Sequence, residues 1–300
     1  MNAIIVSYFN PDLDGVACSI ALAALEYPAL AARVLGNLDR ETRLVLDTLD
    51  LPIPLTLTDW SNVEVIWLVD THHPKQLPAG FPAHLVTQII DHHPGGSPET
   101  YPHAEIQNEA VGAAATLVAE RFERRSVNMP AEIAVLLQAA ILSNTLEFSA
   151  PATSNRDRRA NESLARIRPL DLRLLDGMRQ IRREKVLLAT DVLLNSDAKV
   201  FETRHGQVVI AQVEAPGALQ ILSRPDLIPA MRQFAASRNT ASAVLNLVDT
   251  EAGKSAVLAT DEQVLGIIAS ALRSPIDARA VVKMDRILQR KTDIIPFIVS

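Results

Sequence analysis

Carboxylate and imidazole side chains gather in four short clusters in the first half of this sequence. The clusters are Asn10-Pro11-Asp12-Leu13-Asp14, Asp70-Thr71-His72-His73, Asp91-His92-His93 and Ser143-Asn144-Thr145. Aspartate oxygens together with imidazole nitrogens form a donor set that suits Mn²⁺ or Mg²⁺. Two such ions about 3.5 to 4 Å apart activate a water and stabilise the leaving oxygen of an in-line phosphoryl displacement. The residue types therefore predict a metal-dependent phosphohydrolase.

The elements around these clusters indicate how the side chains come together. Apolar runs of strand length occupy residues 3–6, 64–69 and 85–90, and helical patterns occupy residues 17–26, 40–50, 113–125 and 130–143. Strands that alternate with helices predict an α/β fold with a doubly wound parallel sheet. Ligands of such sheets bind beyond the carboxyl ends of the strands. Three clusters follow predicted strands and the fourth ends the apolar stretch 133–142, so we expect all four to meet at one edge.

The length of the chain favours two domains. Three hundred residues are more than one hydrophobic core usually serves. We predict a metal-binding domain over residues 1–191 and a smaller, mixed-sheet α/β domain over residues 192–300. In the second domain the pattern predicts strands at 198–203 and 207–213 joined by a turn at 204–206, then a helix at 228–237, strands at 243–248 and 255–259, and an extended tail at 287–299.

The composition argues against several classes of partner. With 35 acidic and 29 basic residues, a net charge of −6 and 4% aromatic residues, the chain offers little attraction or stacking surface to long nucleic acid. The single cysteine, Cys18, fits a reducing compartment. The N-terminus lacks the basic start of a signal peptide, and apolar runs such as 15–25 are shorter than a membrane span. We expect a cytoplasmic protein with a small phosphorylated substrate and no membrane partner.

The four clusters resemble the successive motifs of the DHH phosphoesterase superfamily, and are most similar to those of the family II, manganese-dependent inorganic pyrophosphatases. The similarity continues in Asn108-Glu109-Ala110-Val111-Gly112, Asp197-Ala198-Lys199-Val200-Phe201 and Gln289-Arg290-Lys291-Thr292-Asp293, so it covers nearly the whole chain. It implies a DHH domain followed by a DHH-associated domain that closes over the substrate. The reaction it implies is hydrolysis of pyrophosphate or a short polyphosphate by a metal-bound water between the two domains.

The resemblance also implies a set of metal ligands. Asp12 and Asp70 would bind one of two Mn²⁺ or Mg²⁺ ions. Asp14, Asp70 and His92 would bind the other, and Asn144 stands at a further ligand position. We expect at least one of the two metal sites to be weak.

Phosphate-binding residues are implied in the same way. His93 would face the phosphate, and Asp91 would support the ligands from outside the metal sphere. Lys199, Arg290 and Lys291 would come from the second domain and bind phosphate oxygens, for which the arginine fork and the lysine point charge are suited.

Three positions depart from the family pattern. Tyr8 stands where the family has a metal-binding histidine, and a neutral phenol is a poor metal ligand because its ordinary pKa is about 10. Asn144 replaces a metal-binding aspartate, and Ser149 replaces a lysine. His72 and His73 follow Asp70 and are candidates to supply the missing nitrogen, although a polar loop after a strand explains them equally well.

Two other functions stay open. The chain could be a diverged, weakly catalytic relative that binds a phosphorylated ligand as a sensor or partner protein. It could also be an oligonucleotide phosphodiesterase, but nuclease relatives usually carry a Gly-Gly-Gly-His element, and Gly95-Gly96 is the only adjacent glycine pair here. Because the acidic clusters and the distant cations are all retained, we favour the hydrolase. A homodimer through an edge strand of the first sheet agrees with the resemblance.

Overall fold

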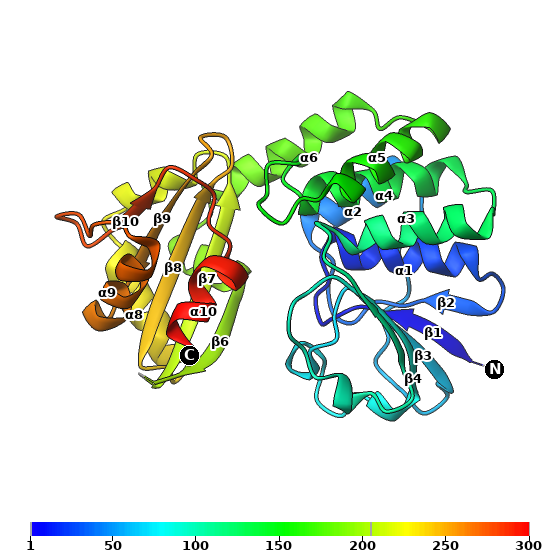
Figure 1. Cartoon of the computed structure of the whole chain (residues 1–300), viewed down its shortest axis with the longest axis horizontal. Helices are drawn as coiled ribbons and strands as arrows, with labels where there is room; N and C mark the ends of the chain where they lie inside the picture. The colour runs from blue at the N-terminus through cyan, green and yellow to red at the C-terminus, as the bar shows by residue number, and fades with distance from the viewer. Residues whose placement is uncertain (1, 205, 300) are drawn as a thin grey trace. The chain divides into compact units, whose positions relative to one another are not determined.

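The structure, a computed structural model, describes residues 2–204 and 206–299. Contacts within the chain divide it into two compact units, Met1–Met178 and Arg179–Ser300 (Figure 1). The division falls within helix α6 (Leu172–Lys185), earlier than the boundary expected between residues 191 and 192. Val186 already packs against the core of the second unit, so this unit begins before the predicted boundary. Within the described ranges, no helix has the length and apolar character that crossing a membrane requires.

A five-stranded parallel sheet forms the centre of the first unit. Its strand order is β2-β1-β3-β4-β5, and every neighbouring pair is parallel. The strands are β1 (Ala3–Val6), β2 (Leu30–Ala32), β3 (Val65–Val69), β4 (Val86–Asp91) and β5 (Glu105–Asn108). The expected α/β class is confirmed. The apolar pattern indicated β1, β3 and β4 but missed β2 and β5, which are short and less apolar.

Helices cover one face of this sheet, and loops with short 3₁₀ turns cover the other (Figure 1). The expected doubly wound sheet would carry helices on both faces, but the connections from β3 to β4 and from β4 to β5 contain only short 3₁₀ turns. The helices of this unit are α1 (Leu13–Leu25), α2 (Arg40–Thr48), α3 (Ala114–Arg125), α4 (Ala131–Asn144) and α5 (Asn155–Ile167). Asn144 therefore ends a helix, α4, and does not follow a strand as its three companion clusters do. Because α4 packs among α1, α3 and α5, residues 133–141 are buried on every side and read as a continuous apolar run.

The second unit is built on a five-stranded mixed sheet with the order β10-β9-β8-β7-β6. Only β7 and β8 pair in parallel, and the other three pairs are antiparallel. The strands are β6 (Ala198–Thr203), β7 (Gly206–Ala215), β8 (Ser242–Asp249), β9 (Lys254–Ala259) and β10 (Val282–Met284). The predicted mixed α/β class of this domain is confirmed. The turn predicted at 204–206 includes position 205, which lies outside the described residues.

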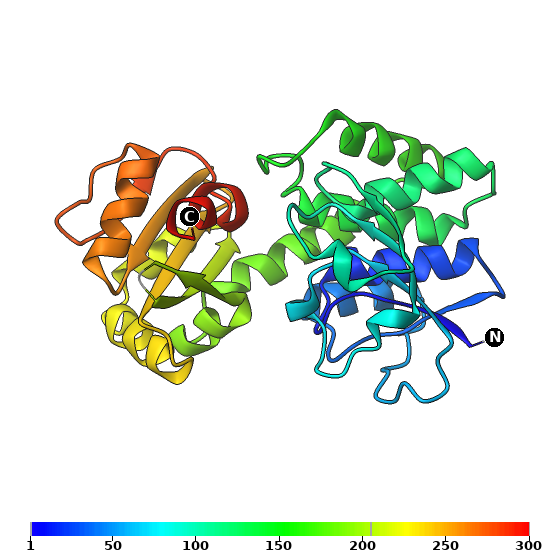
Figure 2. The ribbon, with the colours of Figure 1, turned by 60° about the horizontal axis from the view of Figure 1, so that its bottom comes forward.

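Helices lie on both faces of the second sheet (Figure 2). They are α7 (Thr190–Ser196) and α8 (Leu227–Ser237) on one face, and α9 (Glu262–Leu272) and α10 (Ile295–Ile298) on the other. The prediction of an extended tail over 287–299 is wrong. Residues 290–294 form a π-helical turn that leads into α10, because Ile294 and Ile298 are drawn into the core against β9 and α9.

Candidate metal centre and active site

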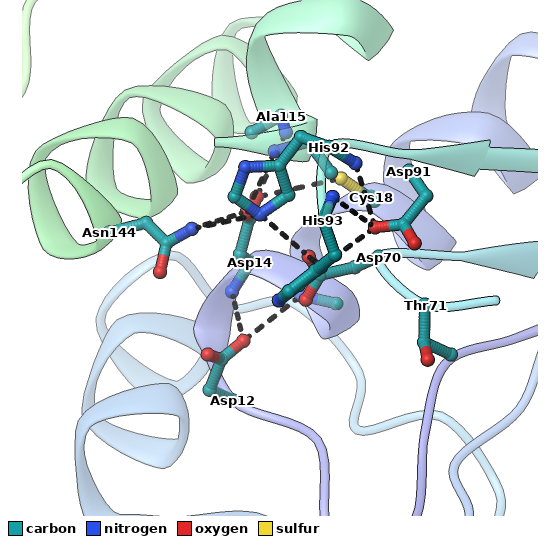
Figure 3. Close-up of polar contacts among 12 residues, drawn as sticks. Asp12, Asp14, Cys18, Asp70, Thr71, Asp91, His92, His93, Ala115 and Asn144 are labelled. Carbon is teal, nitrogen blue, oxygen red and sulfur yellow. Dashed lines mark hydrogen bonds and ion pairs between the residues drawn. The ribbon is translucent and has the colours of Figure 1, made fainter. Parts of the chain in front are cut away.

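The ends of two adjacent strands and the start of one helix bring the predicted clusters together in the first unit (Figure 3). Asp70 follows β3, His92 and His93 follow β4, and α1 begins directly after Asp12. One ligand atom from each of Asp70, His92 and His93 lies within 4.8 Å of the other two. This group could hold a metal ion, and its place at the carboxyl ends of parallel strands is the one expected for a ligand.

Asp70 is held in an unusual backbone conformation. Its φ is +59°, in the left-handed region of backbone conformation that residues other than glycine rarely adopt. Its N–H donates to the Ile90 carbonyl at 2.8 Å, which fixes the residue to the end of β4. A Cβ at Gly15 would lie 2.3 Å from the Ser7 hydroxyl and 3.4 Å from Asp70 Oδ2, so the glycine lets α1 approach both residues. The carboxylate is buried where α1 meets the sheet.

Asp12 caps the first turn of α1. Its Oδ1 accepts from the N–H groups of Asp14 and Gly15 at 3.0 and 3.2 Å. The Asp12 N–H donates to the Tyr8 phenol oxygen at 3.2 Å. Burial, assisted by the negative charges of Asp12 and Asp70, raises the pKa of Tyr8 well above its usual range. The phenol that stands at the family histidine position is therefore neutral and is a poor metal ligand.

Asp14 is buried against the N-terminus of α3. Its Oδ2 accepts from the Ala114 N–H at 2.8 Å and its Oδ1 from the Ala115 N–H at 2.9 Å. The residue before α3 is an alanine, which cannot cap the helix with its own side chain, so Asp14 does so from α1. Burial and the neighbouring Asp70 charge raise the pKa of Asp14 well above its usual range. A cation beside these two carboxylates would offset that penalty.

His92 presents a lone pair to the two aspartates. Its Nδ1 lies 2.9 Å from the Val111 carbonyl, which can only accept, so Nδ1 carries the proton in the neutral ring. The bare Nε2 then lies 3.2 Å from Asp70 Oδ1 and 3.9 Å from Asp14 Oδ2. Two lone-pair groups that face each other at 3.2 Å need a cation or a proton between them. This donor set fits a divalent metal ion.

His93 is tied to Asp91, the first residue of the same cluster. Asp91 Oδ1 accepts from His93 Nδ1 at 2.7 Å and from the His93 backbone N–H at 3.1 Å. Its Oδ2 contacts His72 Nδ1, and His72 Nε2 faces the Gly95 carbonyl. The hydrogen bond that His72 donates to Asp91 raises the pKa of His72. His73 stacks on His72 with 5.2 Å between ring centroids, and the metal cluster described above includes neither ring.

Asn144 directs a hydrogen-bond donor toward the same centre. Its Nδ2 lies 2.9 Å from Asp14 Oδ2 and 3.1 Å from the Gly112 carbonyl, and both partners are acceptors. The same nitrogen lies 3.5 Å from His92 Nε2. The amide therefore donates at the place where the resemblance predicts an acidic ligand. Ser149, the third position that departs from the family pattern, donates a hydrogen bond from its hydroxyl group to the backbone carbonyl of Leu146.

The sequence interpretation missed Asp157, which holds the loop that supports His92 and Asn144. The Asp157 carboxylate is fully buried and accepts from Gly112 N–H at 2.9 Å and from Thr116 Oγ1 at 2.6 Å. It also forms a capping box with Ser154 at the start of α5. The Ser-x-x-Asp spacing before a helical segment could have indicated the cap, but not the link to Gly112, 45 residues away.

The three predicted phosphate-binding cations lie in the second unit. Arg290 is 5% exposed, and its Nη2 donates to Asp197 Oδ1 at 2.7 Å. Its Nη1 reaches the carbonyls of Asp197 and Ile210 at 3.1 and 3.3 Å. Lys199 on β6 and Lys291 beside Arg290 are partly exposed. The Arg290 guanidinium thus has a structural role within its own unit.

Known proteins share both units of this chain. Residues 2–141 match the N-terminal domain of the DHH family, and residues 177–300 match the DHHA2 domain. A Staphylococcus aureus (strain JH9) protein named as a probable manganese-dependent inorganic pyrophosphatase is 30% identical over 227 residues, which are 74% of either chain.

Two solved structures show the same fold. A Methanococcus jannaschii protein assigned to the family II inorganic pyrophosphatases superposes with a TM-score of 0.82 at 22% identity, over 98% of this chain and 97% of that chain. An exopolyphosphatase-related protein from Bacteroides fragilis superposes with a TM-score of 0.54 at 15% identity, over 90% of this chain and 82% of that chain. At these identities the likeness concerns the fold alone.

Proposed function

The chain belongs to the DHH family, close to the family II inorganic pyrophosphatases, and on that premise we propose that it hydrolyses a phosphoanhydride, either pyrophosphate or a short polyphosphate, with a divalent metal ion. The observation that supports this proposal is the cluster of Asp70, His92 and His93 at the ends of β3 and β4. The S. aureus relative is named as manganese-dependent, which makes Mn²⁺ the first metal to test.

The residues of the cluster would have different roles in metal binding and in substrate binding. Asp70 and His92 would hold the ion, with Asp12 and Asp14 beside them. A bound Mn²⁺ or Mg²⁺ supplies positive charge that stabilises phosphoryl oxygens. His93, whose Nδ1 is fixed by Asp91, would use its remaining nitrogen to bind a phosphoryl oxygen or to hold a proton.

The cations of the second unit remain proposed phosphate ligands. Lys199, Arg290 and Lys291 are proposed together, and the Arg290 guanidinium, which already contacts Asp197 and two backbone carbonyls, would have to give up some of these contacts to bind phosphate. A homodimer likewise remains a proposal, and sedimentation of the purified protein tests it directly.

Phosphate release is the decisive measurement. Pyrophosphate, tripolyphosphate and a short oligonucleotide would each be incubated with Mn²⁺, Mg²⁺ or Co²⁺. We expect release from at least one of the two phosphoanhydrides, and its loss in Asp70→Ala. His103→Asn, at an exposed histidine that belongs to none of the four clusters, is the matched control. No release from any substrate with any metal would overturn the proposal, and release from the oligonucleotide alone would point to a phosphodiesterase.

One observation favours a second candidate function. The amide of Asn144 donates into the metal centre at the position of an acidic ligand, and this weakens the attraction for a second cation. A relative that binds a phosphorylated ligand without turnover agrees with that arrangement. Calorimetric binding of pyrophosphate without phosphate release would support it.

A further inference from the structure

His72 is a buried histidine that the proposed reaction does not use. Its side chain is 3% exposed, although it lies in the loop that follows β3. Its Nδ1 faces Asp91 Oδ2 and its Nε2 faces the Gly95 carbonyl. Both partners accept hydrogen bonds, so each ring nitrogen acts as a donor. Both ends of the ring are therefore held.

The backbone beside His72 is shaped to admit this ring. A Cβ at Gly96 would lie 1.8 Å from His72 Nε2 and 2.0 Å from Cδ2, so the ring could not keep its place beside a side chain at this position. Gly96 also has a φ of +98°. The glycine pair after the Asp91 cluster thus closes over the edge of the imidazole, and a residue with a side chain at position 96 would push the ring out.

The Asp91 carboxylate connects His72 to His93. It is completely buried, with Oδ2 on His72 and Oδ1 on His93 Nδ1 at 2.7 Å. One carboxylate therefore joins two imidazoles, and only the His93 ring belongs to the metal cluster. When His72 is removed, Oδ2 loses its donor, and the carboxylate is held at Oδ1 alone, by the N–H groups of His92 and His93 at 2.7 and 3.1 Å and by His93 Nδ1. The carboxylate can then rotate about that anchor, which changes the acceptor geometry at His93 Nδ1.

We propose that His72 is a positioning residue, which orients the His93 ring at the metal centre by holding the Asp91 carboxylate between the two histidines. The inference deepens the proposed function and rests on it for what His93 does to substrate. The placement of the His93 ring is independent of turnover and can be measured without it.

Nitrogen-15 spectra of histidine side chains in the full chain supply that measurement. In the wild type we expect His93 as a single Nδ1–H form, because Nδ1 donates to Asp91. In His72→Ala the His93 signal should lose its single Nδ1–H form. In His72→Asn, whose amide N–H can replace the Nδ1–H donor to Asp91, that form should return in large part.

A second pair of variants displaces His72 without changing it. Gly96→Ala places a methyl group in the space of the ring, whereas Gly80→Ala adds the same methyl at a φ of +78° with no atom within 4 Å. Both substitutions carry the backbone cost of a side chain at positive φ. Only Gly96→Ala should alter the His93 signal.

Steady-state kinetics then connect the placement of His93 to function. Loss of a residue that orients an active-site group typically costs about 10- to 100-fold, so we expect kcat to fall by that factor in His72→Ala, with recovery in His72→Asn. A His93 signal that is unchanged in both His72→Ala and Gly96→Ala would overturn the inference, whether or not the protein hydrolyses phosphate. Loss of phosphate release with an unchanged His93 signal would do so as well, because the effect would then not run through His93.

Discussion

The carboxamide nitrogen of Asn144 lies 2.9 Å from the carboxylate of Asp14. Asp14 already accepts from the N–H groups of Ala114 and Ala115 at the start of α3, so three N–H groups donate to one carboxylate. Each of these donors occupies a lone pair that a cation would otherwise use. The arrangement gives a structural reason for the expectation that one metal site is weak.

Replacing Asn144 by aspartate should tighten metal binding and weaken the metal-free fold. The substitution removes a donor and adds a partly buried negative charge beside Asp14, so the free energy of unfolding without metal should fall by about 1–3 kcal/mol. With Mn²⁺ present the added carboxylate becomes a ligand, and we expect affinity to rise at least about tenfold, or ~1.4 kcal/mol. Calorimetry with Mn²⁺ measures the affinity, and urea unfolding with and without Mn²⁺ measures the stability.

Asn144→Ala is the control, because it removes the donor but adds no ligand and should not tighten Mn²⁺ binding. Equal Mn²⁺ affinities for the aspartate and alanine variants would contradict this account.

Tyr8→His should restore a nitrogen donor near Asp12 and Asp70. Burial keeps the phenol of Tyr8 protonated, whereas a neutral imidazole offers a lone pair to Mn²⁺. We expect tighter Mn²⁺ binding in the single variant, and a higher rate of phosphate release when it is combined with Asn144→Asp. Tyr8→Phe is the control, because it removes the hydroxyl that accepts from the Asp12 N–H without adding a ligand. An unchanged metal affinity in the double variant would show that these two residues do not face the ion.

The sequence was sufficient for the elements whose pattern follows from burial alone. Strands β1, β3 and β4 are apolar because both faces of the sheet are covered, and the clusters after them meet because neighbouring strands are parallel. The short strands β2 and β5 carry too little pattern to be recognised. The tail after residue 287 was misread because its helical turns depend on Ile294 and Ile298 finding a core formed by distant strands.

Local pattern could not predict which partner each site residue chooses. His72 and His73 are equivalent in a list of residues, but only the His72 ring is enclosed between Asp91 and Gly95. Arg290 has the sequence context of a phosphate ligand, yet its buried guanidinium bonds to Asp197, 93 residues earlier in the chain. Such pairings depend on packing between segments far apart in sequence, so they cannot be predicted from the hydrophobic period of one segment.

Arg290→Ala should destabilise the second unit independently of any effect on catalysis. It removes hydrogen bonds to the side chain and backbone of Asp197 and to the Ile210 carbonyl, and hydrogen bonds of charged groups contribute about 1.5–3 kcal/mol each. We expect unfolding free energy to fall by about 3 kcal/mol, whereas Lys291→Ala, at a partly exposed neighbour, should change it by about 0.5 kcal/mol or less. Urea unfolding of both variants decides this. Equal stabilities would leave Arg290 available as a phosphate ligand in the sense the family resemblance implies.

The pH dependence of stability should carry a contribution from His72. Its hydrogen bond to Asp91 raises its pKa in the folded chain above 6.5, the ordinary value for a histidine side chain. The folded state therefore holds the proton more tightly than the unfolded state, and the stabilisation is complete below about pH 6.5 and is lost as the pH rises through the raised pKa. The difference in unfolding free energy between wild type and His72→Asn, measured without metal, should shrink as the pH rises above about 6.5. The same difference for His103→Asn serves as the baseline, and a His72 difference that grows with pH would give the wrong sign.

Asp157 should prove as important to the site as residues nearer the metal. Its buried carboxylate holds Gly112 N–H, Thr116 and the start of α5, and the carbonyls of Val111 and Gly112 orient His92 and Asn144 in turn. Asp157→Ala leaves several buried donors without an acceptor, so we expect unfolding free energy to fall by about 3–5 kcal/mol.

Asp157→Asn keeps one acceptor oxygen, so its unfolding free energy should fall less. Its amide group opposes the N–H groups of Gly112 and Ser154 and should therefore shift the loop. Weaker Mn²⁺ binding in Asp157→Asn, measured by calorimetry under conditions where the variant is folded, would show that the loop fixes the position of the His92 ring. Mn²⁺ affinity equal to that of the wild type would mean that Asp157 supports the fold but not the metal centre.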